Sequence, residues 1–162
     1  MMKILLPLVL VVLGVGLVLA FKSPSQQSKE PVETTRTTRE VALACDKEKA
    51  HGFHVHSTLE IVVNGEPVPV PENIGVRETC MTVLHTHTPD GLIHVESPEK
   101  RDFTLADFFA VWEKPFTKDE ILSYRTDATH RIVVTVDGVE VDTFENTVLK
   151  DTARIVIRYE AI

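Results

Sequence analysis

Histidines are concentrated in two short stretches of the 162-residue chain. The stretch "HGFHVHSTLE" contains His51, His54 and His56, and "LHTHTPDGLIHVESP" contains three more of the seven histidines. Neutral imidazole is a ligand for Zn²⁺, Cu²⁺, Ni²⁺ and Fe²⁺, and it also exchanges protons near neutral pH. The two stretches therefore indicate metal binding or proton handling.

Each stretch contains a His-x-His pair in a segment typical of a β-strand. Strand side chains alternate between faces, so the two histidines of a pair point the same way, with Cα atoms roughly 6.5–7 Å apart. Two such imidazoles can converge on one ion about 2.0–2.1 Å from each nitrogen. A third nitrogen from a neighbouring strand would leave one position open for water.

The second stretch is predicted to form a hairpin through the four-residue loop 88–91. This loop places His85 opposite His94 and His87 opposite Leu92. The apolar side chains then share one face of the hairpin: Leu84, Ile93 and Val95. A three-residue loop ending in a glycine bulge would shift the pairing by one residue and mix the two faces, so we expect the four-residue loop.

The polar faces of these strands supply the candidate metal ligands. The predicted set is His85, His87, His94, His54, His56 and Glu96. His54 and His56 either complete the coordination of the same ion or hold a second one, and Glu96 and Glu60 are candidates for a ligand or for an acceptor behind a ligand. In the competing interpretation, the imidazoles bond to one another and to threonines on a solvated face. The remaining His51 and His130 are interpreted as incidental.

Strand and turn signals surround the histidines. Asn64-Gly65 and Asp137-Gly138 each separate two strand-like runs, and such dipeptides favour type I′ hairpin turns. A further strand is predicted over residues 153–160. The fold class is therefore mostly β (α+β), a single domain built of antiparallel hairpins with one or two short helices after the second hairpin.

The predicted helices follow the histidine hairpin. In "DFTLADFFAVWE", Thr104 is the expected N-cap with Asp107 in capping-box position, and Phe103 is placed to pack against Phe108. The aromatic stripe of this segment has helical spacing and is interpreted as core. A second capping-box pattern, Thr117 with Glu120, predicts another helix over residues 117–125.

The N-terminal part of the chain predicts export. Residues 1–21 contain 18 uncharged apolar or small residues, Ile4–Phe21, which favours a membrane anchor or a cleaved signal peptide. Residues 22–40 are rich in Ser, Thr, Gln and Pro and are interpreted as a flexible stalk. We therefore expect residues 41–162 to form an extracytoplasmic β-rich domain, anchored through the N-terminal segment or secreted.

The two cysteines predict a disulfide, and the net charge limits the classes of binding partner. Outside the cytoplasm, Cys45 and Cys80 are expected to form a disulfide, although one thiolate as a metal ligand is the alternative. The formal charge is −7, without a basic cluster. This composition argues against a nucleic-acid partner and suits attraction of cations.

The motifs also resemble those of an uncharacterised family of small prokaryotic secreted or membrane-anchored proteins. The likeness runs closely from Cys45 to Trp112, through "HVHSTLEIVVNGEPVPVPENIGV", Cys80, "LHTHTPDGLIHVESP" and "FTLADFFAVWE". Ala106 departs from the pattern, where glycine is expected. The resemblance supports the selection of the two His-x-His pairs, His94 and Glu96 as candidate site residues, and it names no activity.

Together these features predict an extracytoplasmic metal-binding protein that holds copper or zinc for sensing, delivery or protection. One alternative is a metal-free envelope interaction module on a stalk, whose histidines respond to pH. The other is a zinc-dependent hydrolase or lyase, with Glu96 as the base for a metal-bound water. An enzyme is the weaker prediction, because the sequence shows no long lid loop and no obvious substrate pocket.

Overall fold

The computed structural model describes residues 36–46 and 52–162. The predicted anchor, most of the predicted stalk and His51 lie outside these ranges. No helix in the described ranges is long and apolar enough to span a membrane.

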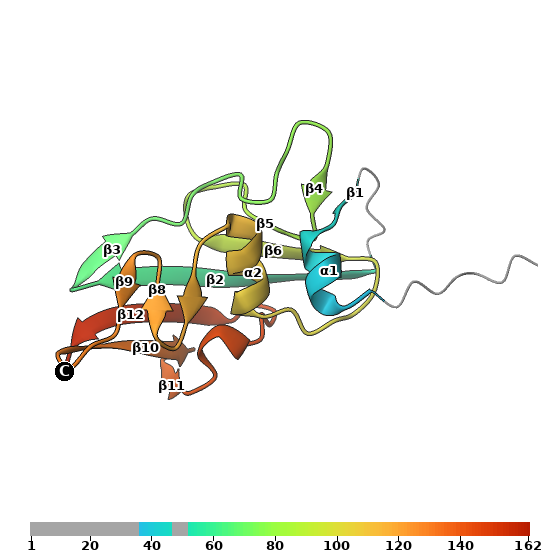
Figure 1. The fold of residues 1–162 in the computed structure, drawn as a ribbon. Coiled ribbons are helices and arrows are strands. Elements are labelled where there is room, and N and C mark those ends of the chain that lie inside the picture. Colours follow the sequence, from blue (N-terminus) through green and yellow to red (C-terminus); the bar gives the residue numbers. More distant parts are fainter. Residues whose placement is uncertain (1–35, 47–51) are drawn as a thin grey trace, which may run out of the picture. The chain divides into compact units, whose positions relative to one another are not determined.

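A seven-stranded sheet forms the centre of the domain (Figure 1). Its strands follow the order β11-β10-β12-β2-β6-β5, and β3 pairs with β2. Their bounds are Phe53–Val63 for β2, Glu66–Val68 for β3, Leu84–His85 for β5, Leu92–Ser97 for β6, His130–Val136 for β10, Val139–Val141 for β11 and Arg154–Ala161 for β12. The mostly β prediction is therefore confirmed.

Both predicted glycine turns are present in this sheet. Asn64-Gly65 joins β2 to β3, Asp137-Gly138 joins β10 to β11, and φ is positive at all four residues. Such φ values are those of a type I′ turn. One feature was not predicted: the C-terminal strand β12 lies between β10 and β2 and runs parallel to β2. The sheet is consequently mixed and not purely antiparallel.

One face of the sheet carries the hydrophobic core. Side chains along β2 alternate between buried and partly exposed, as expected for a strand with only one face covered. Helix α2 (Leu105–Trp112) lies over the buried face in Figure 1. Phe103, Phe108 and Phe109 are fully buried there, so the aromatic stripe is core. The predicted cap is also present, since Asp107 Oδ2 accepts hydrogen bonds from the backbone N–H and hydroxyl of Thr104.

A short helix, α1 (Thr38–Leu43), packs beside α2 and begins inside the segment predicted to be stalk. Thr37 and Glu40 form a capping box at its start. Arg39 joins it to α2, because its Nε lies 3.0 Å from Asp107 Oδ1 and its Nη1 donates to the Ala106 carbonyl at 2.6 Å. Residues 38–40, assigned to the stalk from the sequence, are therefore helical.

The predicted helix over residues 117–125 is wrong. This segment forms a small sheet of three two-residue strands: β7 (Phe116–Thr117), β8 (Glu120–Ile121) and β9 (Tyr124–Arg125). The Thr117 hydroxyl accepts from the Asp119 N–H at 3.2 Å, and Leu122 turns the chain with φ of 55°. The apolar residues Phe116 and Ile121 are five apart, a spacing that does not repeat on one helical face.

The predicted disulfide is confirmed. Cys45 and Cys80 are bonded at the edge of a two-stranded pairing between β1 (Cys45–Asp46) and β4 (Met81–Thr82). Only one residue, Val83, separates β4 from β5, so the bridge connects the N-terminal edge of the domain to the strand that carries His85. A disulfide is typical of proteins in oxidising compartments outside the cytoplasm. A single-turn 3₁₀ helix, Phe144–Asn146, precedes β12.

Candidate metal centre

Strand β6 carries His94 between two strands that also carry histidines. His94 lies opposite His56 of β2 on one side and opposite His85 of β5 on the other. Residues opposite each other in an antiparallel pair project from the same face. The predicted register of the hairpin, with His85 opposite His94, is therefore confirmed.

The same face carries the other predicted residues of β2 and β6. His54 lies opposite Glu96, two positions along from the pair of His56 and His94. The intervening residues Val55 and Val95 point into the core. A single alternation thus separates a histidine face from an apolar face on these strands.

His87 reaches this group by a different route from the one predicted. Strand β5 ends at His85, because the Thr86 N–H donates to the Ile74 carbonyl at 3.1 Å and draws the chain away from β6. The connection therefore spans Thr86–Gly91, two residues longer than the predicted loop, and His87 is not paired with Leu92. Its ring nevertheless lies 4.8 Å from that of His85 and 4.9 Å from that of His94.

The far end of this connection is fixed onto β2. The Leu59 N–H donates to the Gly91 carbonyl at 2.8 Å. Asp90 Oδ1 accepts from the Leu92 N–H at 3.1 Å and from the Thr88 hydroxyl at 2.8 Å. These hydrogen bonds lower the pKa of the Asp90 carboxyl. The loop that carries His87 is thus held at both ends by backbone contacts.

Two groups of three histidines are spaced so that each could hold a metal ion. The first trio consists of His54, His56 and His94, and the second trio of His85, His87 and His94. Within each trio the candidate ligand nitrogens lie within 4.8 Å of one another. His94 belongs to both.

The first trio already contains two nitrogens at the separation of metal ligands. His56 Nε2 lies 3.1 Å from His94 Nδ1. Two ligands about 2.0–2.1 Å from a tetrahedral ion are about 3.3 Å apart. Without an ion, one of these nitrogens carries a proton that is donated to the other. This hydrogen bond between His56 and His94 is also what the competing interpretation of the sequence expects, in which the imidazoles bond to one another without a metal.

In the second trio, His85 is the buried member, with no exposed surface. Its Nδ1 lies 3.1 Å from the Thr82 carbonyl oxygen, a partner that can only accept. In the neutral ring, Nδ1 therefore carries the proton and the lone pair is at Nε2. A backbone acceptor behind the ring is the usual support of a metal-binding histidine. Nothing in the sequence pattern marks Thr82 for this role, because the contact uses its backbone oxygen.

Glu96 lies between the trios. Its Oε1 is 3.5 Å from His54 Nε2 and 3.9 Å from His85 Nε2, and its side chain is 14% exposed. It can therefore compensate charge on either side. Glu60, the other acidic candidate, does not join the cluster in this structure, since its carboxylate pairs with Arg154 at 2.9 Å.

The environment of His94 favours its neutral form. Partial burial lowers the pKa of His94, and the neighbouring His56 and His87 lower it further, against an opposing effect of Glu96. Only a neutral imidazole has a lone pair for a metal. The residue shared by both trios therefore keeps its ligand form to lower pH than an ordinary histidine does.

Comparisons with family models, with curated proteins and with solved structures find no match. The chain's resemblance to a family of small exported proteins stays a prediction. The geometry of the site accordingly rests on this chain alone.

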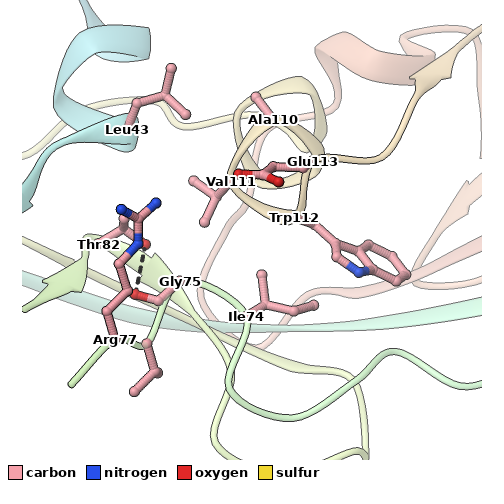
Figure 2. A pocket seen from close by; sticks show the side chains of 10 residues that line it. Leu43, Ile74, Gly75, Arg77, Thr82, Ala110, Val111, Trp112 and Glu113 are labelled. Carbon is pink, nitrogen blue, oxygen red and sulfur yellow. Dashed lines mark hydrogen bonds between the residues drawn. The ribbon is translucent and has the colours of Figure 1, made fainter.

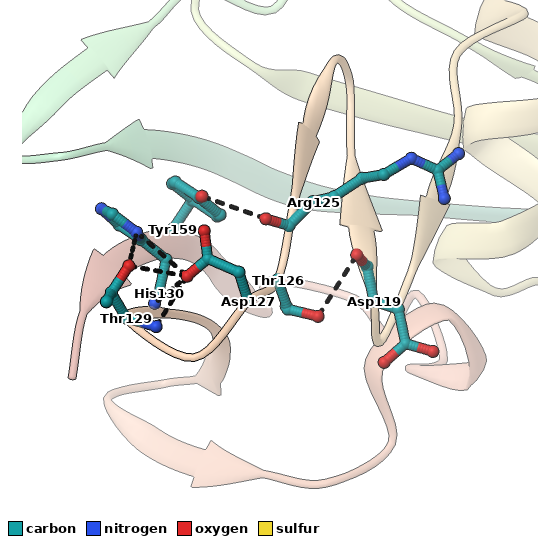
Figure 3. Close-up of polar contacts among 7 residues, drawn as sticks. All are labelled: Asp119, Arg125, Thr126, Asp127, Thr129, His130 and Tyr159. Atoms are coloured by element: carbon teal, nitrogen blue, oxygen red, sulfur yellow. Dashed lines mark hydrogen bonds and ion pairs between the residues drawn. The ribbon is translucent and has the colours of Figure 1, made fainter.

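His130 belongs to neither trio. Figure 3 shows it in a turn at the start of β10, stacked on Tyr159 with ring centroids 5.0 Å apart. Asp127 accepts from the Thr129 hydroxyl and the N–H groups of Thr129 and His130, and these bonds lower its pKa to about 2. The hydrogen bonds of this cluster stabilise the turn before β10. His130 is therefore a suitable histidine for control substitutions.

Proposed function

We propose that the domain is an extracytoplasmic metal-binding protein that takes up copper or zinc at a cluster of five histidines, which consists of His94 and the four histidines around it. The observation that carries this proposal is the position of His94 on the middle strand, with a histidine opposite it on each neighbouring strand. His94 and the four imidazoles around it together provide more nitrogen ligands than a tetrahedral ion needs.

The ligand chemistry restricts the ion. The site offers imidazole nitrogens and one nearby carboxylate, a set that suits zinc and divalent copper and not calcium or magnesium, which prefer oxygen. The acidic net charge of −7 further favours the approach of cations. Imidazole sites bind Cu²⁺ more tightly than Zn²⁺, so we expect both ions to bind in vitro and copper to displace zinc.

Exposure favours binding and exchange over catalysis. The His54 side chain is 48% exposed, and His87 is also exposed. An ion bound here is therefore accessible to molecules in solution that deliver or accept metal. The cavity in Figure 2, about 240 Å³, lies between α1, α2 and residues 74–77. None of the three cavities described for the structured residues has a histidine in its lining. A metal hydrolase would be expected to place its ion in such a pocket.

The proposal is tested by metal titration of the full chain after removal of bound metal with a chelator. We expect uptake of one equivalent of Zn²⁺ or Cu²⁺, and His94→Ala should weaken the affinity by more than about 100-fold, since even the loss of a partner behind a ligand costs 10–100-fold. His130→Ala is the matched control and should bind as the unaltered chain does. No uptake by the unaltered chain, or unchanged affinity of the His94→Ala chain, would overturn the proposal.

A further inference from the structure

The two trios share His94, and this sharing limits how they are used. A neutral imidazole has one nitrogen with a lone pair, whereas the other nitrogen carries a proton. His94 can therefore serve as a neutral ligand in one trio at a time. Simultaneous use would require the ring to lose its second proton and bridge two ions.

The orientation of the His94 ring also separates its use in the first trio from its use in the second. Its plane is almost perpendicular to that of His56, at 82°, and Nδ1 faces His56 Nε2 at 3.1 Å. Its plane is almost parallel to that of His85, at 9°, with ring centroids 5.2 Å apart. Binding an ion together with His85 and His87 therefore needs the other nitrogen of His94 or a rotated ring.

Charge opposes two ions at once. Glu96 lies close to a histidine of each trio, and the Asp90 carboxylate interacts electrostatically with His94. These two carboxylates carry two negative charges, against four positive charges for two divalent ions. Repulsion between close ions in a partly buried site is only weakly screened by salt. One ion is consequently favoured over a bridged pair.

The trios differ in how firmly their ligands are held. In the first trio, the His54 side chain is 48% exposed and its nearest charged partner is Glu96 at 3.5 Å. In the second trio His87 is also exposed, but His85 is fully buried and its ring is held by the Thr82 carbonyl. Ligands that are already ordered lose less conformational entropy when they bind, so the second trio should hold an ion longer.

We propose that the cluster offers one metal ion two alternative positions, the first trio for exchange with solution and the second trio for retention, with His94 as the ligand common to both. This inference rests on the proposed function, because it concerns the same histidines. In this arrangement His94 is a ligand in both positions, and the transfer from His54 and His56 to His85 and His87 uses its other nitrogen or a rotation of its ring. The protein then loads at the first trio and stores at the second, which contains the buried His85.

The test compares metal stoichiometry in three full-length chains. The unaltered chain should bind one equivalent of Zn²⁺, and so should each pair variant: His54→Ala/His56→Ala, which keeps the second trio, and His85→Gln/His87→Ala, which keeps the first. Glutamine at position 85 still offers a donor to the Thr82 carbonyl, and circular dichroism checks that the variant is folded. If the glutamine variant unfolds, His87→Ala alone replaces it, and the same result is expected.

Release to an excess of chelator provides the second readout. The variant that keeps the second trio should release Zn²⁺ at least about tenfold more slowly than the variant that keeps the first. Two equivalents on the unaltered chain, loss of binding in either folded pair variant, or equal release rates would overturn the two-position inference while leaving metal binding in place. No uptake by the unaltered chain would instead overturn the proposed function itself.

Discussion

His94 lies directly opposite His56 on β2 and directly opposite His85 on β5. The two cross-strand pairs are not equivalent, because the first is an edge-on contact between ring nitrogens and the second a parallel stack of rings. The histidine face is therefore asymmetric about its central residue.

Gly91 fixes the histidine loop onto β2 and should not tolerate a side chain. Its φ is +78°, and a Cβ would lie 2.1 Å from the Leu59 carbonyl oxygen. We expect Gly91→Ala to reduce the free energy of unfolding by more than about 3 kcal/mol, because steric overlap adds to backbone strain. Urea denaturation measures the loss.

Gly138 is the matched control for that substitution. Its φ is +83°, and nothing lies within 4 Å of a Cβ built there. Gly138→Ala should therefore show backbone strain alone, about 1–2 kcal/mol. Equal losses in the two variants would mean that the contact of Gly91 with Leu59 does not matter.

The stability of the metal-free chain should depend on pH through His94. Its pKa is lowered in the folded state, first by burial and then by His56 and His87. The unfolded chain therefore binds a proton at position 94 more readily than the folded chain does. The stabilisation that neutral His94 contributes to folding is complete above the ordinary histidine pKa of about 6.5, and it is lost as the pH falls through the lower pKa of the folded state. His94→Gln should flatten this dependence.

The measurement is a series of urea midpoints between pH 7.5 and 5. The groups acting on His94 include His54, His56 and His87, which oppose its protonation, and Glu96, which favours it. Only the difference between the His94→Gln and unaltered chains is diagnostic, because it isolates the contribution of position 94. A difference that stays constant with pH would contradict the assigned environment.

The Cys45–Cys80 bridge should stabilise both the fold and the second trio. It closes a loop over a sequence separation of 35 and anchors β4, whose Thr82 carbonyl holds His85. Cys45→Ser/Cys80→Ser should lower the free energy of unfolding by about 4 kcal/mol, because the bridge reduces the conformational entropy of the unfolded chain by an amount that depends on the length of the closed loop. Zn²⁺ should also dissociate faster from this variant.

His130→Ala serves again as the comparison for dissociation, since His130 contacts neither the bridge nor the trios in the described part of the chain. If the variant without the disulfide loses stability and yet releases Zn²⁺ at the unaltered rate, the link from the bridge through Thr82 to His85 is not functional.

Much of the candidate site could be predicted from residue alternation. A one-residue slip would have exposed Ile93 and Val95, so burial determines the register that places His85 opposite His94. The hairpin turns could also be predicted from local sequence, because the residues of Asn64-Gly65 and Asp137-Gly138 suit positive φ angles. The disulfide was predictable from two cysteines in an exported chain.

The remaining features depend on contacts between distant segments. Thr86 leaves β6 because the Ile74 carbonyl accepts its N–H, which no local pattern around His87 indicates. The parallel pairing of β12 with β2 joins residues almost a hundred positions apart, such as Ile155 and Leu59. The capping-box pattern of Thr117 failed because a pattern of nine residues has little helical preference unless an apolar face supports it.

The central claim, that the histidines around His94 bind a metal ion, is tested most directly by X-ray absorption at the zinc edge. The full chain, loaded with one equivalent of Zn²⁺, should show a first shell of nitrogen and oxygen at about 2.0–2.1 Å. It should also show the outer-shell scattering of three imidazole rings. A shell of oxygen ligands without imidazole scattering, or a zinc signal that stays in the free-ion form, would contradict the account.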